Sequence, residues 1–157
     1  MPTIDVAHPP QLVMRLLNPT LRTALRVPGL GASLKDFMVL EYTGRKSGRR
    51  FSVTISAHHL DGELYAMAEA GWKYNFADGA PADVWYRGKQ TPMQGQLIKD
   101  PATVADIAHR VATGYGAKKA QRSMGLSFST PTVPSLDDFA EAIPRLHIGA
   151  IKLTPRT

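Results

Sequence analysis

The residues best suited to chemistry lie in one short segment, 43–50, with the sequence TGRKSGRR. It holds four cations, two glycines and two hydroxyl side chains. A glycine-containing turn of this kind offers backbone N–H groups, a hydroxyl and several cations in a small volume, which suits phosphate. The alternative interpretation is a solvated hairpin tip. The glycine spacing is too short for a Walker A loop, and no Gly-Lys-Ser/Thr follows.

The histidines and the missing cysteines bear on other chemistry. His58 and His59 are adjacent, and neighbouring side chains on a strand point to opposite faces, so the pair cannot easily chelate one ion. One of the two could instead line a ligand cleft. The sequence contains no Cys, which excludes thiolate nucleophiles and Cys-based metal sites. We therefore predict no metal site.

The elements that must position the cationic turn are strands. Apolar and β-branched runs on both sides of the turn indicate two strands joined by it. Asp61-Gly62 and Arg87-Gly88 signal two further tight turns. Five strands linked mainly by tight turns predict an antiparallel sheet that curls into a small barrel. The predicted strands span residues 37–43, 50–59, 63–69, 82–88 and 91–98.

Helices are predicted on both sides of this barrel. The first spans residues 9–27, and Pro19 interrupts or ends it. Further helices are predicted at 102–113 and 117–124, then a loop at 126–134, a short helix from the Ser135 cap to Ala142, and a last strand at 146–153. The prediction is thus an α+β fold, a split β-barrel of about six antiparallel strands with flanking helices. A single domain would cover residues 1–157, with a helical segment 9–30, the barrel 37–98 and a C-terminal part 101–153.

Composition and charge narrow the function classes. Of the 157 residues, 43% are apolar and 20% are charged, which is ordinary for a globular protein. No signal peptide is evident, and no apolar run approaches the length of a membrane span. We therefore expect a cytoplasmic protein. Residues 1–50 hold eight Lys/Arg and three Asp/Glu, which gives this segment a net charge of +5. The remaining residues hold eleven Lys/Arg and ten Asp/Glu, a net charge of only +1. Such a field suits an anionic ligand, a membrane surface or nucleic acid.

Two of these partners can be weighed from the placement of the cations. Nucleic acid is disfavoured, because the cations gather in one turn without interleaved aromatic residues. Arg15, Arg22 and Arg26 punctuate the apolar stripe of the N-terminal helix. Peripheral membrane contact through that helix is conceivable, and ordinary packing on the core of the domain is the alternative.

Three blocks of the chain carry a wider pattern. Residues 17–31 begin with Leu-Asn-Pro, residues 40–48 close on Thr-Gly-Arg-Lys-Ser-Gly, and residues 71–88 contain Trp72, Asn75 and a later Arg-Gly. In order and sequence these blocks resemble the deazaflavin-dependent nitroreductase family, whose members use the reduced deazaflavin coenzyme F-420 on a split β-barrel. The family pattern continues with an Arg and, three residues later, a Pro. Phe51 and Thr54 stand at those positions here, and Arg50 lies one residue early, on the opposite face of a regular strand.

The resemblance implies roles for named residues. The turn would cradle the phosphate and acidic tail of the coenzyme, the following strand would offer backbone groups to the deazaflavin ring, and the third block would support the far side of the pocket. The implied coenzyme-binding residues are Arg45, Lys46, Ser47, Gly48, Arg49, Arg50, Ser52, Val53, Thr54, Ile55, Trp72 and Asn75. Family members often use a C-terminal Tyr as proton donor, and Tyr115, between two glycines, is the candidate.

The resemblance also implies an activity. The chain would be an oxidoreductase that passes a hydride from reduced F-420 to an electron-poor small molecule such as a quinone, an activated alkene or a nitro compound. FMN is the alternative cofactor. A protein that binds a deazaflavin, another flavin or a lipid-like ligand without turnover is the alternative function. Split-barrel proteins of this kind can be monomers or homodimers.

Overall fold

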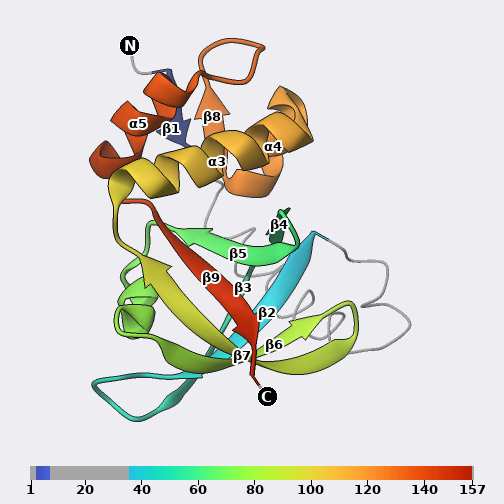
Figure 1. The fold of residues 1–157 in the computed structure, drawn as a ribbon, viewed down its shortest axis with the longest axis vertical. Coiled ribbons are helices and arrows are strands. Elements are labelled where there is room, and N and C mark those ends of the chain that lie inside the picture. The colour runs from blue at the N-terminus through green and yellow to red at the C-terminus, as the bar shows by residue number, and fades with distance from the viewer. Residues whose placement is uncertain (1–2, 8–35, 157) are drawn as a thin grey trace.

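The computed structural model describes residues 3–7 and 36–156, and it has two layers. A curled antiparallel sheet forms one layer, and three helices with a small two-stranded sheet lie over one end of it (Figure 1). The α+β class and the antiparallel, barrel-like sheet predicted from the sequence are confirmed. The predicted N-terminal helix, 9–27 within the segment 9–30, and the membrane contact assigned to it lie outside the described residues.

The main sheet has seven strands in the order β3-β2-β6-β7-β9-β5-β4, and every neighbouring pair is antiparallel. Tight turns join β4 to β5 and β6 to β7, as predicted. Asp61 and Gly62 have φ values of 54° and 79°, and Arg87 and Gly88 have φ values of 55° and 78°. The strands are β2 (Phe37–Thr43), β3 (Arg50–Ser56), β4 (His58–Leu60), β5 (Glu63–Ala68), β6 (Ala80–Tyr86), β7 (Lys89–Ile98) and β9 (Gly149–Pro155).

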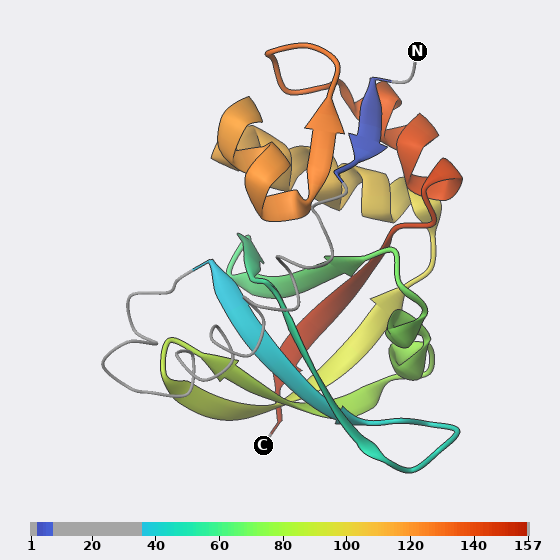
Figure 2. The same cartoon turned by 180° about the vertical axis from the view of Figure 1, so that it is seen from behind.

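The hairpin of β2 and β3 carries the cationic turn. Its register is unbroken from the pair Thr43–Arg50 to the pair Phe37–Ser56, so β3 contains no bulge. Arg50 and Phe51 therefore point to opposite faces of the strand. The turn between the strands protrudes beyond the rest of the sheet (Figure 2). β3 is also an edge strand of the described sheet, because only β2 pairs with it.

Two predicted strands differ most from the observed ones, and those predicted at 82–88 and 91–98 each begin two residues earlier, as β6 and β7. The strand predicted at 50–59 is divided into β3 and β4 at Ala57. The Ala57 N–H still donates to the Asp36 carbonyl (2.9 Å), in register with the β2–β3 ladder, and beyond it β4 pairs with β5. The strand predicted to begin at Leu146 begins at Gly149. The preceding helix runs further than predicted, and Leu146 and His147 end it, the latter with a φ of 56°.

The helical layer contains α3 (Pro101–Tyr115), α4 (Ala117–Met124) and α5 (Leu136–Arg145). Asp100 caps α3 by accepting from the Thr103 N–H, and Ser135 begins α5 with a reciprocal capping box. The loop predicted at 126–134 is wrong at its start. There β8 (Leu126–Phe128) pairs with β1 (Ile4–Val6), as Figure 2 shows.

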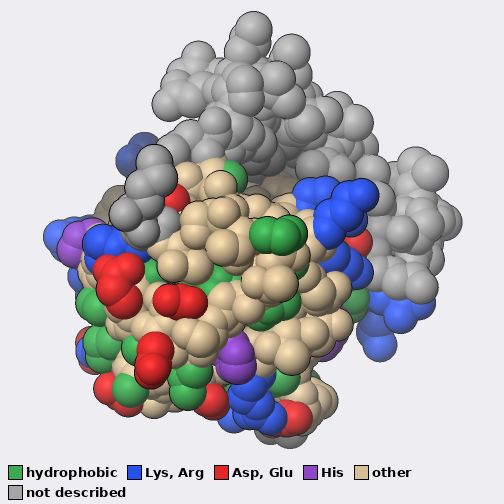
Figure 3. All heavy atoms as spheres, turned by 90° about the horizontal axis from the view of Figure 1, so that it is seen from above, with side chains coloured by type: hydrophobic (Ala, Val, Ile, Leu, Met, Phe, Trp, Pro, Cys, Tyr) green, Lys and Arg blue, Asp and Glu red, His purple; other side chains and the backbone are tan. Residues whose placement is uncertain are grey.

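Each layer has its own hydrophobic core. One centres on Phe139 and the facing sides of α3 and α5, and the other fills the barrel around Phe76 and Leu40. β9 belongs to both, because Ala150 packs in the first and Ile151 in the second. Viewed from above, the helical layer shows charges of both signs with only separate hydrophobic areas between them (Figure 3). None of the helices described combines the length and hydrophobicity needed to cross a bilayer.

Candidate functional site

The cationic turn forms the rim of a pocket of about 330 Å³. Three cations line it, and no acidic side chain of the described chain does. The turn supplies one wall and the 3₁₀ helix η1 (Gly71–Phe76) the other. The lining residues are Gly44, Arg45, Lys46, Ser47, Arg49, Phe51, Gly71, Tyr74 and Asn75. We call this the anion pocket.

The backbone of the turn is organised largely by its own hydrogen bonds. The N–H of Gly48 donates to the Gly44 carbonyl (2.9 Å), and that of Arg49 donates to Ser47 Oγ (3.2 Å). Among the described residues, the N–H groups of Lys46 and Ser47 have no such partner. Fewer backbone donors are thus available than a fully open turn would offer, and side-chain cations supply most of the positive charge.

Asn75 fixes the turn to η1. Its side-chain oxygen accepts from the Arg45 N–H (2.9 Å), and its amide donates to the Trp72 carbonyl (2.7 Å). One side chain thus holds together the two walls of the anion pocket. The residue was predicted to support the coenzyme pocket. Its contacts are those of a positioning residue.

Arg50 and Ser52 lie apart from the other predicted site residues. Arg50 points to the face opposite Phe51 and forms an ion pair with Asp83 (2.5 Å), which also pairs with Arg156 (3.3 Å). Ser52 stands on the same face as Arg50, opposite Glu41 on β2, and lines neither the anion pocket nor the cleft described below. Gly48 holds a φ of 71° and gives the turn its shape without lining the pocket.

A row of aromatic rings leads from the anion pocket into the molecule. Phe51 stacks on Tyr42 at a centroid distance of 5.9 Å, and Tyr42 stacks on Trp72 at 6.0 Å. Phe51 covers Gly44 so closely that a Cβ there would lie 2.7 Å from the ring. Trp72 then forms part of the wall of the next cavity.

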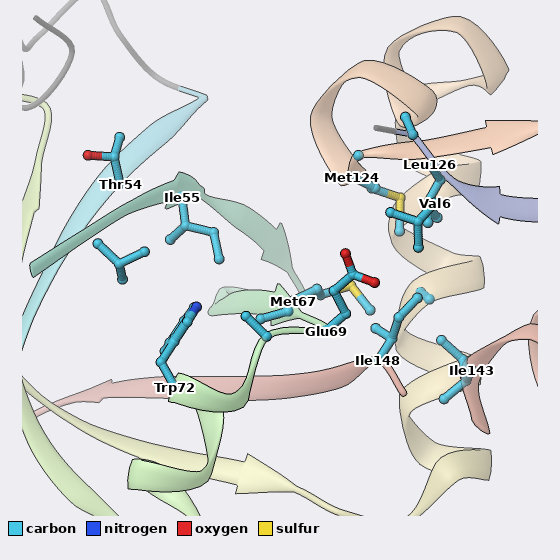
Figure 4. Close-up of a pocket in the computed structure, with 16 residues that line it drawn as sticks. Val6, Thr54, Ile55, Met67, Glu69, Trp72, Met124, Leu126, Ile143 and Ile148 are labelled. Carbon is cyan, nitrogen blue, oxygen red and sulfur yellow. The ribbon is translucent and has the colours of Figure 1, made fainter. Parts of the chain in front are cut away.

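This next cavity, which we call the cleft, has a volume of about 300 Å³ and lies between the sheet and the helical layer. Trp72, Thr54 and Ile55 stand on its sheet side, and Met124, Leu126, Val6, Ile143 and Ile148 stand opposite (Figure 4). Met67 and Glu69 lie between the two groups (Figure 4). The cleft adjoins the anion pocket, because Phe51 and Gly71 line one and Val53 and Trp72 the other.

Strand β3 presents its edge to the cleft. Val53, Thr54 and Ile55 all line it, although successive side chains of a strand point to opposite faces. Three consecutive residues reach one cavity only when the hydrogen-bonding edge of the strand faces it. At this edge, alternate residues direct backbone N–H and C=O groups away from β2. A ligand with donors and acceptors along one rim of a flat ring matches such an edge.

Tyr115 lies away from both cavities, at the end of α3. Its hydroxyl is 2.9 Å from His58 Nδ1 and 3.4 Å from the Ala57 carbonyl. Burial, with a contribution from Asp36, raises the pKa of Tyr115 to about 12. Burial also lowers the pKa of His58 to about 4 and keeps the imidazole neutral at physiological pH.

The two histidines point to opposite faces, as predicted. His58 is 1% exposed, whereas His59 is exposed and its Nε2 lies 3.0 Å from the Tyr86 hydroxyl. Neither histidine lines the cleft or the anion pocket, where one of them was expected; His58 lines a separate chamber beside the cleft. Within residues 3–7 and 36–156, no three His, Cys, Asp or Glu side chains are arranged to hold a metal ion.

Several lining residues gave no sign of their position in the sequence. Met67, Ile143 and Ile148 are ordinary apolar residues of a strand, a helix and a loop, and β1 contributes Val6 from the other end of the chain. Lys73 is buried, and its ammonium donates to the Glu69 carbonyl (2.7 Å), which fixes the segment between β5 and η1. Apolar periodicity predicts burial and does not distinguish a cavity wall from a core.

Comparisons with family models and with curated proteins gave no match. Among solved structures, the chain resembles a domain-swapped dimer at 14% identity and a TM-score of 0.45, over 92% of this chain and 98% of the other. It also resembles an F-420-H2-dependent reductase, FDR-A, at 12% identity and a TM-score of 0.44, over 76% of this chain and 95% of the other. A third similar structure is a conserved hypothetical protein from Mycobacterium tuberculosis, at 10% identity and a TM-score of 0.45, over 98% of this chain and 84% of the other. At these values the likenesses do not bear on activity.

Proposed function

We propose that this protein binds reduced coenzyme F-420 and passes a hydride from it to an electron-poor organic acceptor. The proposal assigns the acidic tail of the coenzyme to the anion pocket and its ring to the cleft. The observation that supports it best is the adjacency of the two cavities along β3. Phe51 and Ile55, four residues apart, line one cavity each, a separation of about 13 Å along an extended strand.

The residues present fit an elongated ligand with one anionic end. Arg45, Lys46 and Arg49 supply positive charge at the tail, where no described carboxylate opposes them. At the ring end, the β3 edge supplies backbone donors and acceptors, and Trp72 supplies a flat apolar wall. A bound reduced deazaflavin supplies a hydride from C5 without a metal. The chain itself binds the ligand, orients its ring and limits the access of water.

A titration tests the proposal directly. Purified protein is added to F-420, and the fluorescence of the coenzyme is followed to saturation. We expect a dissociation constant in the micromolar range or below that weakens as salt is added, because part of the affinity comes from exposed cations. FMN, which has a phosphate and no acidic tail, should bind more weakly. Absence of saturable binding at micromolar F-420 would remove the enzyme proposal.

Turnover separates a reductase from a carrier. The reduced coenzyme is mixed with protein and a panel of quinones, activated alkenes and nitroaromatic compounds, and its oxidation is followed by absorbance. A reductase accelerates oxidation with at least one acceptor class. Tight binding with no acceleration across the panel would favour a protein that only carries a deazaflavin or flavin. Tighter binding of FMN than of F-420 would favour the alternative cofactor.

A further inference from the structure

Exposed aromatic surface gathers at the anion pocket. The described residues include three exposed large hydrophobic side chains, and two of them, Phe51 (39% exposed) and Tyr74 (47%), line this pocket. They stand on opposite walls, because Phe51 follows the cationic turn on β3 and Tyr74 belongs to η1. An acidic tail is recognised by cations and gives no reason for exposed rings. The function proposed above therefore leaves these two rings unused.

Tyr74 has one face open to a ligand. The ammonium of Lys73 lies 4.6 Å from the centroid of the ring. Since Lys73 is only 4% exposed, this ammonium covers the face of the ring that is turned to the interior. Its ammonium donates to the carbonyls of Glu69 (2.7 Å) and Ala70 (3.5 Å), and it forms no ion pair with a described carboxylate. An unneutralised positive charge thus stands behind the open face of the ring.

Phe51 and Arg49 form the facing wall. The ring of Tyr42 stacks on Phe51 at a centroid distance of 5.9 Å, and the guanidinium carbon of Arg49 lies 5.6 Å from the Phe51 centroid. Arg49 and Phe51 are both exposed, and both line the pocket. Aromatic rings and guanidinium planes both stack on flat heterocycles. The pocket therefore offers a stacking surface on each of its two sides.

Donors for an anion stand next to these stacking surfaces. Asn75, beside the ring of η1, accepts a hydrogen bond from the Arg45 N–H (2.9 Å), which holds the turn against η1. The N–H groups of Lys46 and Ser47 have no partner among the described residues. The Ser47 hydroxyl accepts from the Arg49 N–H and keeps its own proton for donation. Free N–H groups, a hydroxyl and cations are the donors that bind phosphate.

We propose that the anion pocket is a binding site for a nucleoside phosphate. The base lies between Tyr74 and the wall of Phe51 and Arg49, and the phosphates meet the cations and free N–H groups of the turn. The volume of about 330 Å³ is at the lower end of small-molecule sites, roughly 300–1,000 Å³, and suits one nucleotide. A nucleic-acid strand would need further stacking surfaces along a groove. The inference stands on this pocket alone, and only competition with the coenzyme tail rests on the proposed function.

Calorimetric titration with a matched ligand series tests the site without any coenzyme. ADP carries base and charge, inorganic pyrophosphate carries the charge alone, and adenosine carries the base alone. We expect saturable binding of ADP that is at least about fivefold tighter than that of pyrophosphate, the contribution of one stacked base, and tighter than that of adenosine. Equal affinities of ADP and pyrophosphate, or no binding of ADP, would overturn the inference. Tighter binding of single-stranded hexadeoxyadenylate than of ADP would overturn it in favour of nucleic acid.

Variants and NMR locate the bound nucleotide. Tyr74→Leu keeps an apolar side chain at an exposed position, and it should weaken ADP binding at least about fivefold and pyrophosphate binding less than about twofold. Lys46→Ala should weaken both ligands, whereas Lys89→Ala, outside the pocket, should weaken neither. The amide signals of Lys46 and Ser47 should shift with ADP, and that of Thr113 in α3 should stay constant. Equal losses for ADP and pyrophosphate in folded Tyr74→Leu, or no loss, would overturn the placement of the base.

Competition separates this inference from the proposed function. If both ligands use the cations of the turn, ADP should raise the apparent dissociation constant of F-420 in proportion to the ADP concentration. If ADP binds and F-420 does not, the proposed function fails and the nucleotide site stands. If F-420 binds and ADP does not, only the nucleotide site is overturned. If both bind without competing and the Lys46 and Ser47 signals respond to ADP, the nucleotide site stands and the coenzyme tail lies elsewhere.

Discussion

The alternation of Arg50 and Phe51 along β3 decides, at the scale of single residues, which cations can serve the anion pocket. The sequence alone predicts that four cations gather in space, because all four lie in one short turn. It also predicts that Arg50 faces away if the strand is regular, and the unbroken register with β2 bears this out. The partner of Arg50 could not be foreseen, since Asp83 lies on β6, 33 residues away.

The first prediction concerns Lys46 and Arg49. Replacing both with Ala should weaken F-420 binding tenfold or more, because each charge-assisted contact to a phosphate or carboxylate contributes about 1.5–3 kcal/mol when fully formed and less at an exposed rim. Fluorescence titration measures the change. The matched control is Lys89→Ala with Lys118→Ala, which removes the same charge from exposed positions that line neither cavity.

The control separates a local contact from the overall field of the protein. We expect the affinity of the control variant to stay within about threefold of the wild type at 0.15 M salt, where charges beyond roughly 8 Å are largely screened. Equal losses in the two double variants would mean that net charge alone attracts the coenzyme. Unchanged affinity in a folded Lys46/Arg49 variant would remove the tail assignment.

At the scale of the elements, features set by local sequence could be predicted, and features set by tertiary packing could not. Hairpin turns were predictable because Asp-Gly and Arg-Gly pairs adopt positive φ locally. The pairing of β1 with β8 was not, because each strand has three residues and they lie about 120 residues apart. The close approach of Gly95 to Phe76 depends likewise on tertiary packing, and no local pattern announces it.

Gly95→Ala should destabilise the fold. A Cβ at this position in β7 would lie 2.6 Å and 2.9 Å from two atoms of the Phe76 ring, which is fully buried. Since Phe76 has no free space into which to move, we expect a loss of about 1–3 kcal/mol in the free energy of unfolding. Urea denaturation of the variant measures this loss. The displaced ring also abuts Trp72 (6.3 Å between centroids), so F-420 affinity should fall too.

Gly114→Ala provides the opposite case at a matched substitution. Gly114 is exposed in the last turn of α3, and a Cβ there would meet no atom within 4 Å. Because Ala loses less conformational entropy than Gly on entering a helix, this variant should gain about 0.5–1 kcal/mol. Equal effects of the two substitutions, in either direction, would contradict the packing argument.

For the whole molecule, the important feature is that the cleft lies where the two cores meet. The barrel was predictable from short strands and tight turns. The cavity was not, because its walls come from residues as distant as Val6, Met67 and Ile148, which only the packing of the helical layer on the sheet brings together. A ligand that fills this cleft would contact both layers at once.

Coenzyme binding should therefore raise the thermal stability of the whole protein. A ligand that binds only the folded state at 100 times its dissociation constant stabilises that state by about 2.7 kcal/mol. For a chain of this length we expect an increase in Tm of roughly 5–10 °C, measured by differential scanning calorimetry. The Lys46/Arg49 variant at the same F-420 concentration should show a smaller increase. An unchanged Tm at a coenzyme concentration far above the dissociation constant would contradict specific binding to the folded state.

The stability of the molecule should also depend on pH through His58. Burial lowers the pKa of this imidazole from 6.5 to about 4, so the folded protein binds fewer protons than the unfolded chain between these values. The contribution is fully present above pH 6.5 and is lost as the pH falls towards 4. Between pH 7.5 and 4.5 the loss should be about 2–3 kcal/mol. His58→Gln should lose correspondingly less stability over this interval in urea denaturation. His59→Gln, the same change one residue along on the exposed side, should retain the wild-type acid sensitivity, and equal behaviour of the two variants would contradict the assignment.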